Sequence, residues 1–163
     1  MWLSDWRNFL WVAVLLTVTS CGFRLQGSEY FPETLETTYI ETADRYSLFY
    51  RELISELEQG GVSVVDSSVA ASAVIRIESD QAGQRVLSVS GRNVPTEYDV
   101  FYNVVYSVWV DGEETLPSTA LSLNQAYTYD ATQVLGKNRE AQVISKSLAQ
   151  NLVRQVSQQL TLL

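Results

Sequence analysis

The sequence predicts an α+β fold in which two helices pack on one face of a mainly antiparallel sheet of about four strands. Residues 45–59 and 138–160 repeat apolar side chains at helical spacing. Between them, residues 98–110 alternate apolar and mixed side chains, which is the period of a strand with one buried face. The order helix, strands, helix is typical of a two-layer sandwich with both helices on the same side of the sheet.

The first predicted helix, residues 45–59, follows a short predicted strand at residues 37–42. Asp44 is its expected N-cap, and Gly60 with Gly61 supplies a stop signal. The apolar positions recur every three or four residues: Tyr46, Phe49, Tyr50, Leu53 and Leu57. This stripe could line a ligand groove, but packing against the sheet is the favoured interpretation.

Turn-forming residues divide the next part of the chain into short strands. Residues 62–65 and 73–79 are predicted to be extended. Asp80-Gln81-Ala82-Gly83 then predicts a turn, after which residues 86–90 resume the extended pattern. Gly91-Arg92-Asn93-Val94-Pro95 predicts a second interruption before the strongest strand.

That strand, residues 98–110, places apolar or aromatic side chains at every even position: Tyr98, Val100, Tyr102, Val104, Tyr106, Val108 and Val110. Its odd positions are mixed, so the second face is half-polar. Asp111-Gly112 predicts a tight turn. Residues 120–129 are the expected antiparallel partner, with one apolar side formed by Leu121, Leu123, Tyr127 and Tyr129.

The second predicted helix, residues 138–160, carries one apolar face at four-residue spacing: Ile144, Leu148, Leu152, Val156 and Leu160. Glutamine and serine residues dominate the opposite face. We expect Lys146 and Arg154 to lie on this solvated side.

The start of the chain is predicted to be a cleaved leader, residues 1–20. Residues 9–18 form a nearly unbroken apolar run, which suits a signal-peptide core but is shorter than the roughly 20 residues that span a bilayer. Val18-Thr19-Ser20-Cys21 resembles the bacterial lipoprotein signal, in which the cysteine is lipidated and becomes the new N-terminus. The alternative is an ordinary buried Cys21 after a plain signal peptide.

Lipidation of Cys21 would make residues 21–163 a single domain with an N-terminal lipid anchor. In lipoproteins, an aspartate directly after the cysteine commonly retains the protein at the inner membrane. Gly22 stands there instead, so we expect attachment to the outer membrane on its periplasmic side.

Composition excludes most catalytic classes. The chain has no histidine and one cysteine, so Ser-His-Asp and Cys-His arrangements, histidine metal ligands and internal disulfides are excluded. Only carboxylate or serine-lysine chemistry would remain open to an enzyme, and we expect neither a cofactor nor a metal. The net charge of −8 disfavours nucleic acid as a partner.

Four features together resemble the LPS-assembly lipoprotein family LptE. They are Cys21-Gly22-Phe23-Arg24-Leu25-Gln26-Gly27 at the lipidation site, the size of the mature domain, Gly91-Arg92-Asn93 before Thr96-Glu97-Tyr98, and the closing helix. The resemblance covers essentially the whole mature chain. One departure is Gln26, which stands where arginine is often found.

The resemblance implies a non-enzymatic role as a plug inside the outer-membrane barrel LptD. It also implies help in assembling that barrel, lipopolysaccharide binding, and delivery of lipopolysaccharide to the outer leaflet. The family's lipopolysaccharide-binding cations match Arg92 and Lys137, with Arg139 beside the latter. A polar, tyrosine-rich sheet surface is expected to contact the barrel lumen.

Two alternatives stay open at this point. The basic residues could be solvated loop charges without a ligand. The protein could also be an unrelated outer-membrane lipoprotein, acting as a small-ligand binder on a tyrosine-rich sheet or as a carboxylate-dependent hydrolase of envelope polymers.

Overall fold

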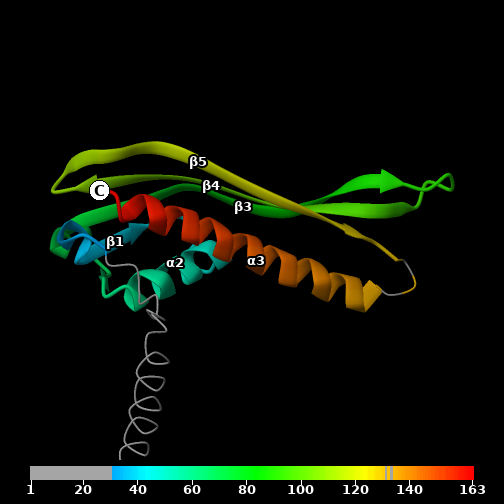
Figure 1. Cartoon of the computed structure of the whole chain (residues 1–163), viewed down its shortest axis with the longest axis horizontal. Coiled ribbons are helices and arrows are strands. Elements are labelled where there is room, and N and C mark those ends of the chain that lie inside the picture. Colours follow the sequence, from blue (N-terminus) through cyan, green and yellow to red (C-terminus); the bar gives the residue numbers. More distant parts are fainter. Residues whose placement is uncertain (1–30, 131, 133) are drawn as a thin grey trace, which may run out of the picture.

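One sheet and two long helices make up the fold, and both helices cover the same face of the sheet (Figure 1). The structure, a computed structural model, describes residues 31–130, 132 and 134–163. The predicted leader and Cys21 lie outside the described residues.

The elements follow one another in a simple order. They are η1 (Glu33–Leu35), β1 (Thr37–Glu41), α2 (Leu48–Gln59), β2 (Ser63–Val65), η2 (Ser68–Ala70), β3 (Ala73–Val89), β4 (Pro95–Val110), β5 (Glu113–Thr128) and α3 (Val134–Leu160). The strands form a five-stranded sheet in the order β2-β1-β3-β4-β5. The predicted α+β class is therefore confirmed, with one strand more than the four or so expected.

Parallel pairing is confined to the short strands. β1 pairs in parallel with both β2 and β3, and α2 supplies the crossover that a parallel pair requires. The long strands β3, β4 and β5 pair antiparallel, so most of the sheet is an antiparallel meander.

The turn predicted at residues 80–83 is wrong, because β3 continues through it as one strand of 17 residues. Gly83 lies opposite Phe101 in β4, and a Cβ atom added at Gly83 would be 2.8 Å from Cζ of that ring. The glycine therefore leaves room for a cross-strand aromatic ring and does not end the strand.

The core lies between the helices and the predicted buried face of β4. Val100, Tyr102, Val104, Tyr106 and Val108 are all buried there, as the alternation predicted. α3 contributes the buried residues Ile144, Leu148, Ala149, Leu152, Val153, Val156 and Leu160. This helix begins at Val134, earlier than predicted, and runs along β4 and β5 (Figure 1). Within the described residues, neither helix is both long and apolar enough to cross a membrane.

α2 begins later than predicted, and Ser47 is its N-cap in place of Asp44. The Ser47 hydroxyl accepts a hydrogen bond from the Tyr50 N–H at 3.1 Å. Asp44 instead accepts from the Tyr46 N–H at 2.8 Å, in a turn that precedes the helix. Serine and aspartate both cap helices well, so the sequence alone does not separate the two positions.

A buried tyrosine joins α2 to the sheet. The Phe49 N–H, one of the free donors at the start of α2, donates to the Tyr102 hydroxyl at 3.1 Å. Burial raises the pKa of Tyr102, because it disfavours the phenolate. The neutral hydroxyl is thus part of the helix cap.

Replacing Tyr102 by phenylalanine is expected to lower the free energy of unfolding by about 1–3 kcal/mol, because the buried Phe49 N–H loses its acceptor. Urea unfolding followed by circular dichroism measures the change. Tyr46→Phe is the matched control. The Tyr46 side chain is exposed, so loss of its hydroxyl should leave the free energy of unfolding nearly unchanged. Equal unfolding midpoints for the two variants would contradict the capping role.

Candidate ligand-binding surface

The turn between β3 and β4 holds Arg92 at the tip of a long hairpin. The Ser90 N–H donates to the Val94 carbonyl at 2.8 Å, and the Asn93 N–H donates to the Ser90 carbonyl at 2.9 Å. Asn93 takes the left-handed conformation, with φ of 61°, which asparagine adopts more readily than most residues. Arg92 is exposed, and none of the described carboxylates forms an ion pair with it.

A cluster of three tyrosines connects the base of this hairpin to the end of β5. The Tyr98 ring in β4 stacks on Tyr127, with centroids 5.9 Å apart, and meets Tyr129 edge-on at 5.0 Å. The Tyr129 N–H also donates to the Thr96 carbonyl at 2.8 Å. The chain entering α3 is thereby fixed against the hairpin.

Lys137, in the first turns of α3, lies against this tyrosine cluster. Its ammonium is 6.0 Å from the centroid of the Tyr127 ring. It also forms an ion pair with Glu140, at 2.8 Å between Nζ and Oε2, and its side chain is only 20% exposed. Lys137 is therefore fixed by an ion pair and an aromatic ring, whereas Arg92 forms no ion pair with the described carboxylates.

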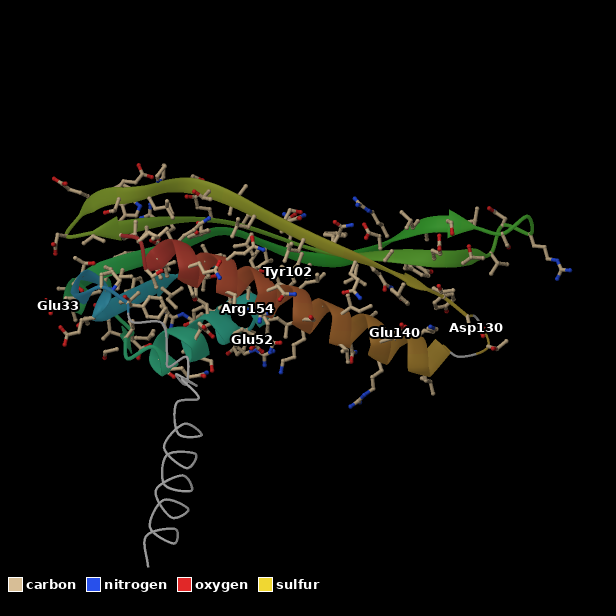
Figure 2. The ribbon with its side chains drawn as sticks, in the orientation of Figure 1. Glu33, Glu52, Tyr102, Asp130, Glu140 and Arg154 are labelled. Atoms are coloured by element: carbon tan, nitrogen blue, oxygen red, sulfur yellow. The ribbon has the colours of Figure 1, made fainter. Side chains whose placement is uncertain are left out.

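The fold brings the hairpin and the start of α3 to the same end of an elongated molecule (Figure 1). Three carboxylates share this end: Glu97 at the base of the hairpin, and Asp130 before α3 and Glu140 on it, the last two labelled in Figure 2. Asp130 accepts hydrogen bonds from the Thr132 hydroxyl and N–H, which lower its pKa. With Arg92, Lys137 and the exposed Arg139, the cations at this end offset these acids, although the whole chain carries −8.

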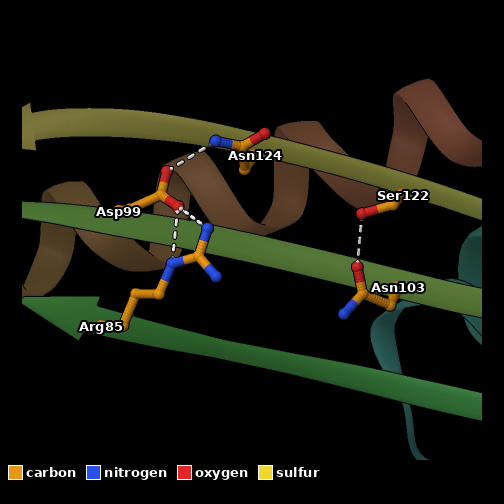
Figure 3. A network of polar contacts seen from close by, with 5 residues as sticks. All are labelled: Arg85, Asp99, Asn103, Ser122 and Asn124. Carbon is orange, nitrogen blue, oxygen red and sulfur yellow. Dashed lines mark hydrogen bonds and ion pairs between the residues drawn. The ribbon is translucent and has the colours of Figure 1, made fainter. Parts of the chain in front are cut away.

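The sheet face turned away from the helices is polar, but it is not tyrosine-rich as predicted. Tyr98, Tyr102, Tyr106 and Tyr127 are directed to the helix side, where they pack in or against the core. The open face carries polar side chains among the apolar residues Phe101, Val105 and Trp109, and Figure 3 shows five of its polar residues. The reason is register, because the even positions of β4 that carry the tyrosines are the ones under the helices.

Asp99 forms the centre of the polar network on this open face (Figure 3). Its side chain is 2% exposed, and it accepts from Asn124 at 2.9 Å and from Arg85 at 2.7 and 3.0 Å. The Asn124 amide and then the Arg85 guanidinium lower its pKa. Three neighbouring strands are thus linked through one carboxylate.

Because folding lowers this pKa, Asp99 contributes stability above its unfolded pKa of about 3.9 and loses that contribution as the pH falls through the folded value. We expect Asp99→Asn to be less stable than the wild type near neutral pH, and the difference to shrink between about pH 4 and pH 2. Urea midpoints measured across that range test this. Asp66→Asn is the control, since Asp66 is fully exposed. A constant difference at all pH values would contradict the prediction.

A cavity of about 530 Å³ lies near the opposite end of the open face, around Arg76 and Trp109. Arg76 lies over the indole ring at 5.6 Å and pairs with Glu41 at 2.8 Å. The hydrogen bond to Glu41 raises the Arg76 pKa, and Glu78 and Glu114 add to the effect. Carboxylates surround this cation, so the hairpin end suits an anionic ligand better than this cavity does.

Comparison with known proteins identifies the family of this chain. Residues 35–160 match the family model described as LptE, Lipopolysaccharide-assembly. The chain belongs to the LptE family. An LptE relative named LPS-assembly lipoprotein LptE, from Yersinia enterocolitica, is 27% identical over 152 residues, which is 90% of this chain and 72% of the relative. The protein of the same name from Yersinia pestis (strain Pestoides F) is 29% identical over 154 residues, with the same coverage.

Solved structures similar to this LptE-family chain show the same fold. The solution structure of uncharacterized lipoprotein B from Nitrosomonas europaea has a TM-score of 0.71 at 22% identity, covering 86% of this chain and 90% of its own. The crystal structure of rare lipoprotein B from Shewanella oneidensis has a TM-score of 0.65 at 22% identity, covering 76% and 92%. At these identities the likeness supports the fold alone.

Proposed function

We propose that this protein is an outer-membrane lipoprotein, attached through Cys21 on the periplasmic side, that plugs an LptD barrel and assists its assembly. It also binds lipopolysaccharide and helps to deliver it to the outer leaflet. One observation carries the proposal: the LptE family match spans residues 35–160, from η1 to the end of α3.

The open sheet face supports the role of a plug. The interiors of wide outer-membrane barrels are polar, so a plug needs polar side chains that can exchange water for hydrogen bonds with the lumen wall. The face that carries Arg85, Asp99, Asn103, Ser122 and Asn124 has this character (Figure 3). The tyrosines pack inward, so a small-ligand site on a tyrosine-rich surface lacks its proposed lining.

Arg92 and Lys137 are the proposed contacts for the phosphates of lipopolysaccharide. Arginine offers a planar pair of donors to phosphate, and Arg92 is free of described ion pairs. Lys137 would exchange its carboxylate partner Glu140 for a phosphate of the ligand.

Co-purification tests the assignment. The full chain with an affinity tag is expressed together with a barrel of the LptD class and extracted in mild detergent, and a stable complex is expected. A chain that never retains the barrel would refute the plug. Depletion that alters only peptidoglycan and leaves surface lipopolysaccharide normal would favour an unrelated envelope lipoprotein.

Glu140→Gln is expected to strengthen lipopolysaccharide binding several-fold, because it frees the Lys137 ammonium from a competing carboxylate. Titration of purified protein with lipopolysaccharide, at low and at high salt, measures the effect, which salt should reduce. Glu56→Gln on α2 is a matched control that removes a charge away from this surface. Unchanged affinity in Glu140→Gln would argue against Lys137 as a ligand contact.

A further inference from the structure

Four exposed aliphatic side chains gather on the hairpin beside Arg92. Their exposed fractions are 48% for Val86, 54% for Leu87, 53% for Val89 and 43% for Val94. We call these four residues the aliphatic arm. Isolated exposed apolar residues are ordinary, but four of them on one projecting hairpin indicate an interaction surface.

The hairpin that carries the arm reaches beyond α3. Figure 1 shows the hairpin of β3 and β4 continuing beyond the first turn of α3. Val86 lies directly opposite Tyr98, so these two side chains share the helix-facing side of the sheet. At Val86 the apolar, helix-facing side of the sheet therefore reaches into the hairpin.

Val86 joins the arm to the tyrosine cluster, because it lies opposite Tyr98, and a cation lies on each side of the arm. Tyr98 stacks on Tyr127, over which the Lys137 ammonium lies. Arg92 occupies the turn between Val89 and Val94. The charged Glu97 is turned to the other face, where Ser88 donates a hydrogen bond to it at 2.8 Å. Exposed aliphatic side chains between two cations fit an amphiphile that has acyl chains next to anionic groups.

We propose that the aliphatic arm binds the acyl chains of the lipopolysaccharide whose phosphates contact Arg92 and Lys137. This inference rests on the proposed function. It assigns the two parts of the ligand, phosphates and acyl chains, to two kinds of side chain. The cations select the phosphates, and Val86, Leu87 and Val89 select the acylated form of the ligand.

The test uses an arm variant, Val86→Thr with Leu87→Thr and Val89→Thr, in the full chain. Threonine keeps strand propensity while it replaces apolar surface with a hydroxyl. The control is Val69→Thr, at a residue that is 95% exposed on η2. Both proteins are titrated with rough lipopolysaccharide and with the same molecule after complete deacylation, which retains its phosphates.

The arm variant is expected to bind the acylated probe roughly tenfold more weakly and the deacylated probe with nearly unchanged affinity. Wild-type affinity of the arm variant for both probes would overturn the inference. The proposed function would stand in that case if Arg92→Asp with Lys137→Asp lost binding. A wild-type chain that binds neither probe would refute lipopolysaccharide binding itself. Loss of barrel co-purification with intact ligand binding would make the arm a barrel contact and would also overturn the inference.

A site-specific probe gives an independent readout. The chain has one cysteine, so Val86→Cys in a Cys21→Ala background accepts a single environment-sensitive dye. The dye emission is expected to shift to shorter wavelength when acylated lipopolysaccharide is added, and to stay unchanged with the deacylated probe. The same dye on Val69→Cys is expected not to respond. An unchanged emission wavelength of the dye at position 86 when the acylated probe is added would overturn the inference.

Discussion

Arg92→Asp combined with Lys137→Asp is expected to weaken lipopolysaccharide binding by a factor of ten to several hundred while the fold stays intact. A charge-assisted hydrogen bond to phosphate contributes about 1.5–3 kcal/mol, and about 1.4 kcal/mol corresponds to a tenfold change in affinity, so this range corresponds to the full loss of one such bond with a smaller loss at the second residue. The reversed charges would also repel the phosphates. Arg92→Asp alone should have the larger effect, because Lys137 already pairs with Glu140.

Arg51→Asp combined with Lys146→Asp is the matched control, because it makes the same change of net charge on α2 and at mid-length of α3. Titration with lipopolysaccharide and circular dichroism of both double variants separate a local contact from a general charge effect. Wild-type affinity of the Arg92 and Lys137 double variant would remove these residues from the site. Equal losses of lipopolysaccharide affinity in the two double variants would indicate that only long-range charge repulsion is being measured.

The parts of the fold that the sequence predicted well are long and have one buried face. Residues 98–110 alternate without interruption, and residues 138–160 repeat at four-residue spacing, so a register error in either would expose the whole apolar set. Both elements are present, and their predicted buried faces are buried except at Tyr98 and Val110, which are partly buried. Their ends were less predictable, because helix and strand termini depend on local hydrogen bonds.

Two of the wrong predictions come from tertiary contacts that no local pattern contains. Gly83 belongs to a strand because the Phe101 ring of β4 packs across it. β5 begins at Glu113, well before the predicted residue 120, and it tolerates Pro117 because it is the edge strand of the sheet. Neither the partner ring nor the edge position can be read from the neighbouring residues.

The candidate site was predictable in its residues but not in its arrangement. Arg92 and Lys137 lie at one end of the molecule only because the hairpin and the start of α3 meet at the tyrosine cluster. The pairing of Lys137 with Glu140 had a visible signal, since opposite charges three residues apart on a helix are neighbours. The sequence signal for the aliphatic arm was weaker: it consisted of the valine and leucine residues around the predicted interruption at residues 91–95.

Cys21→Ala is expected to release the protein from the outer membrane. Each buried methylene contributes about 0.8 kcal/mol, and one acyl chain alone holds a protein only marginally, so the several chains of a lipidated cysteine form a lasting anchor. The variant should therefore shift from the membrane fraction to the periplasmic fraction when the barrel is absent.

Mass spectrometry of the mature N-terminus provides the direct measurement, because the wild type should begin at Cys21 and carry fatty-acyl mass that Cys21→Ala lacks. Ser20→Ala is the control, since it keeps a small residue before the cysteine and should leave the acylation unchanged. Acyl mass that persists in Cys21→Ala would show that another residue is lipidated. If the barrel retains the unlipidated variant in the membrane fraction, the lumen contacts of the open sheet face suffice to hold the plug, and the anchor then serves to deliver the chain to the barrel.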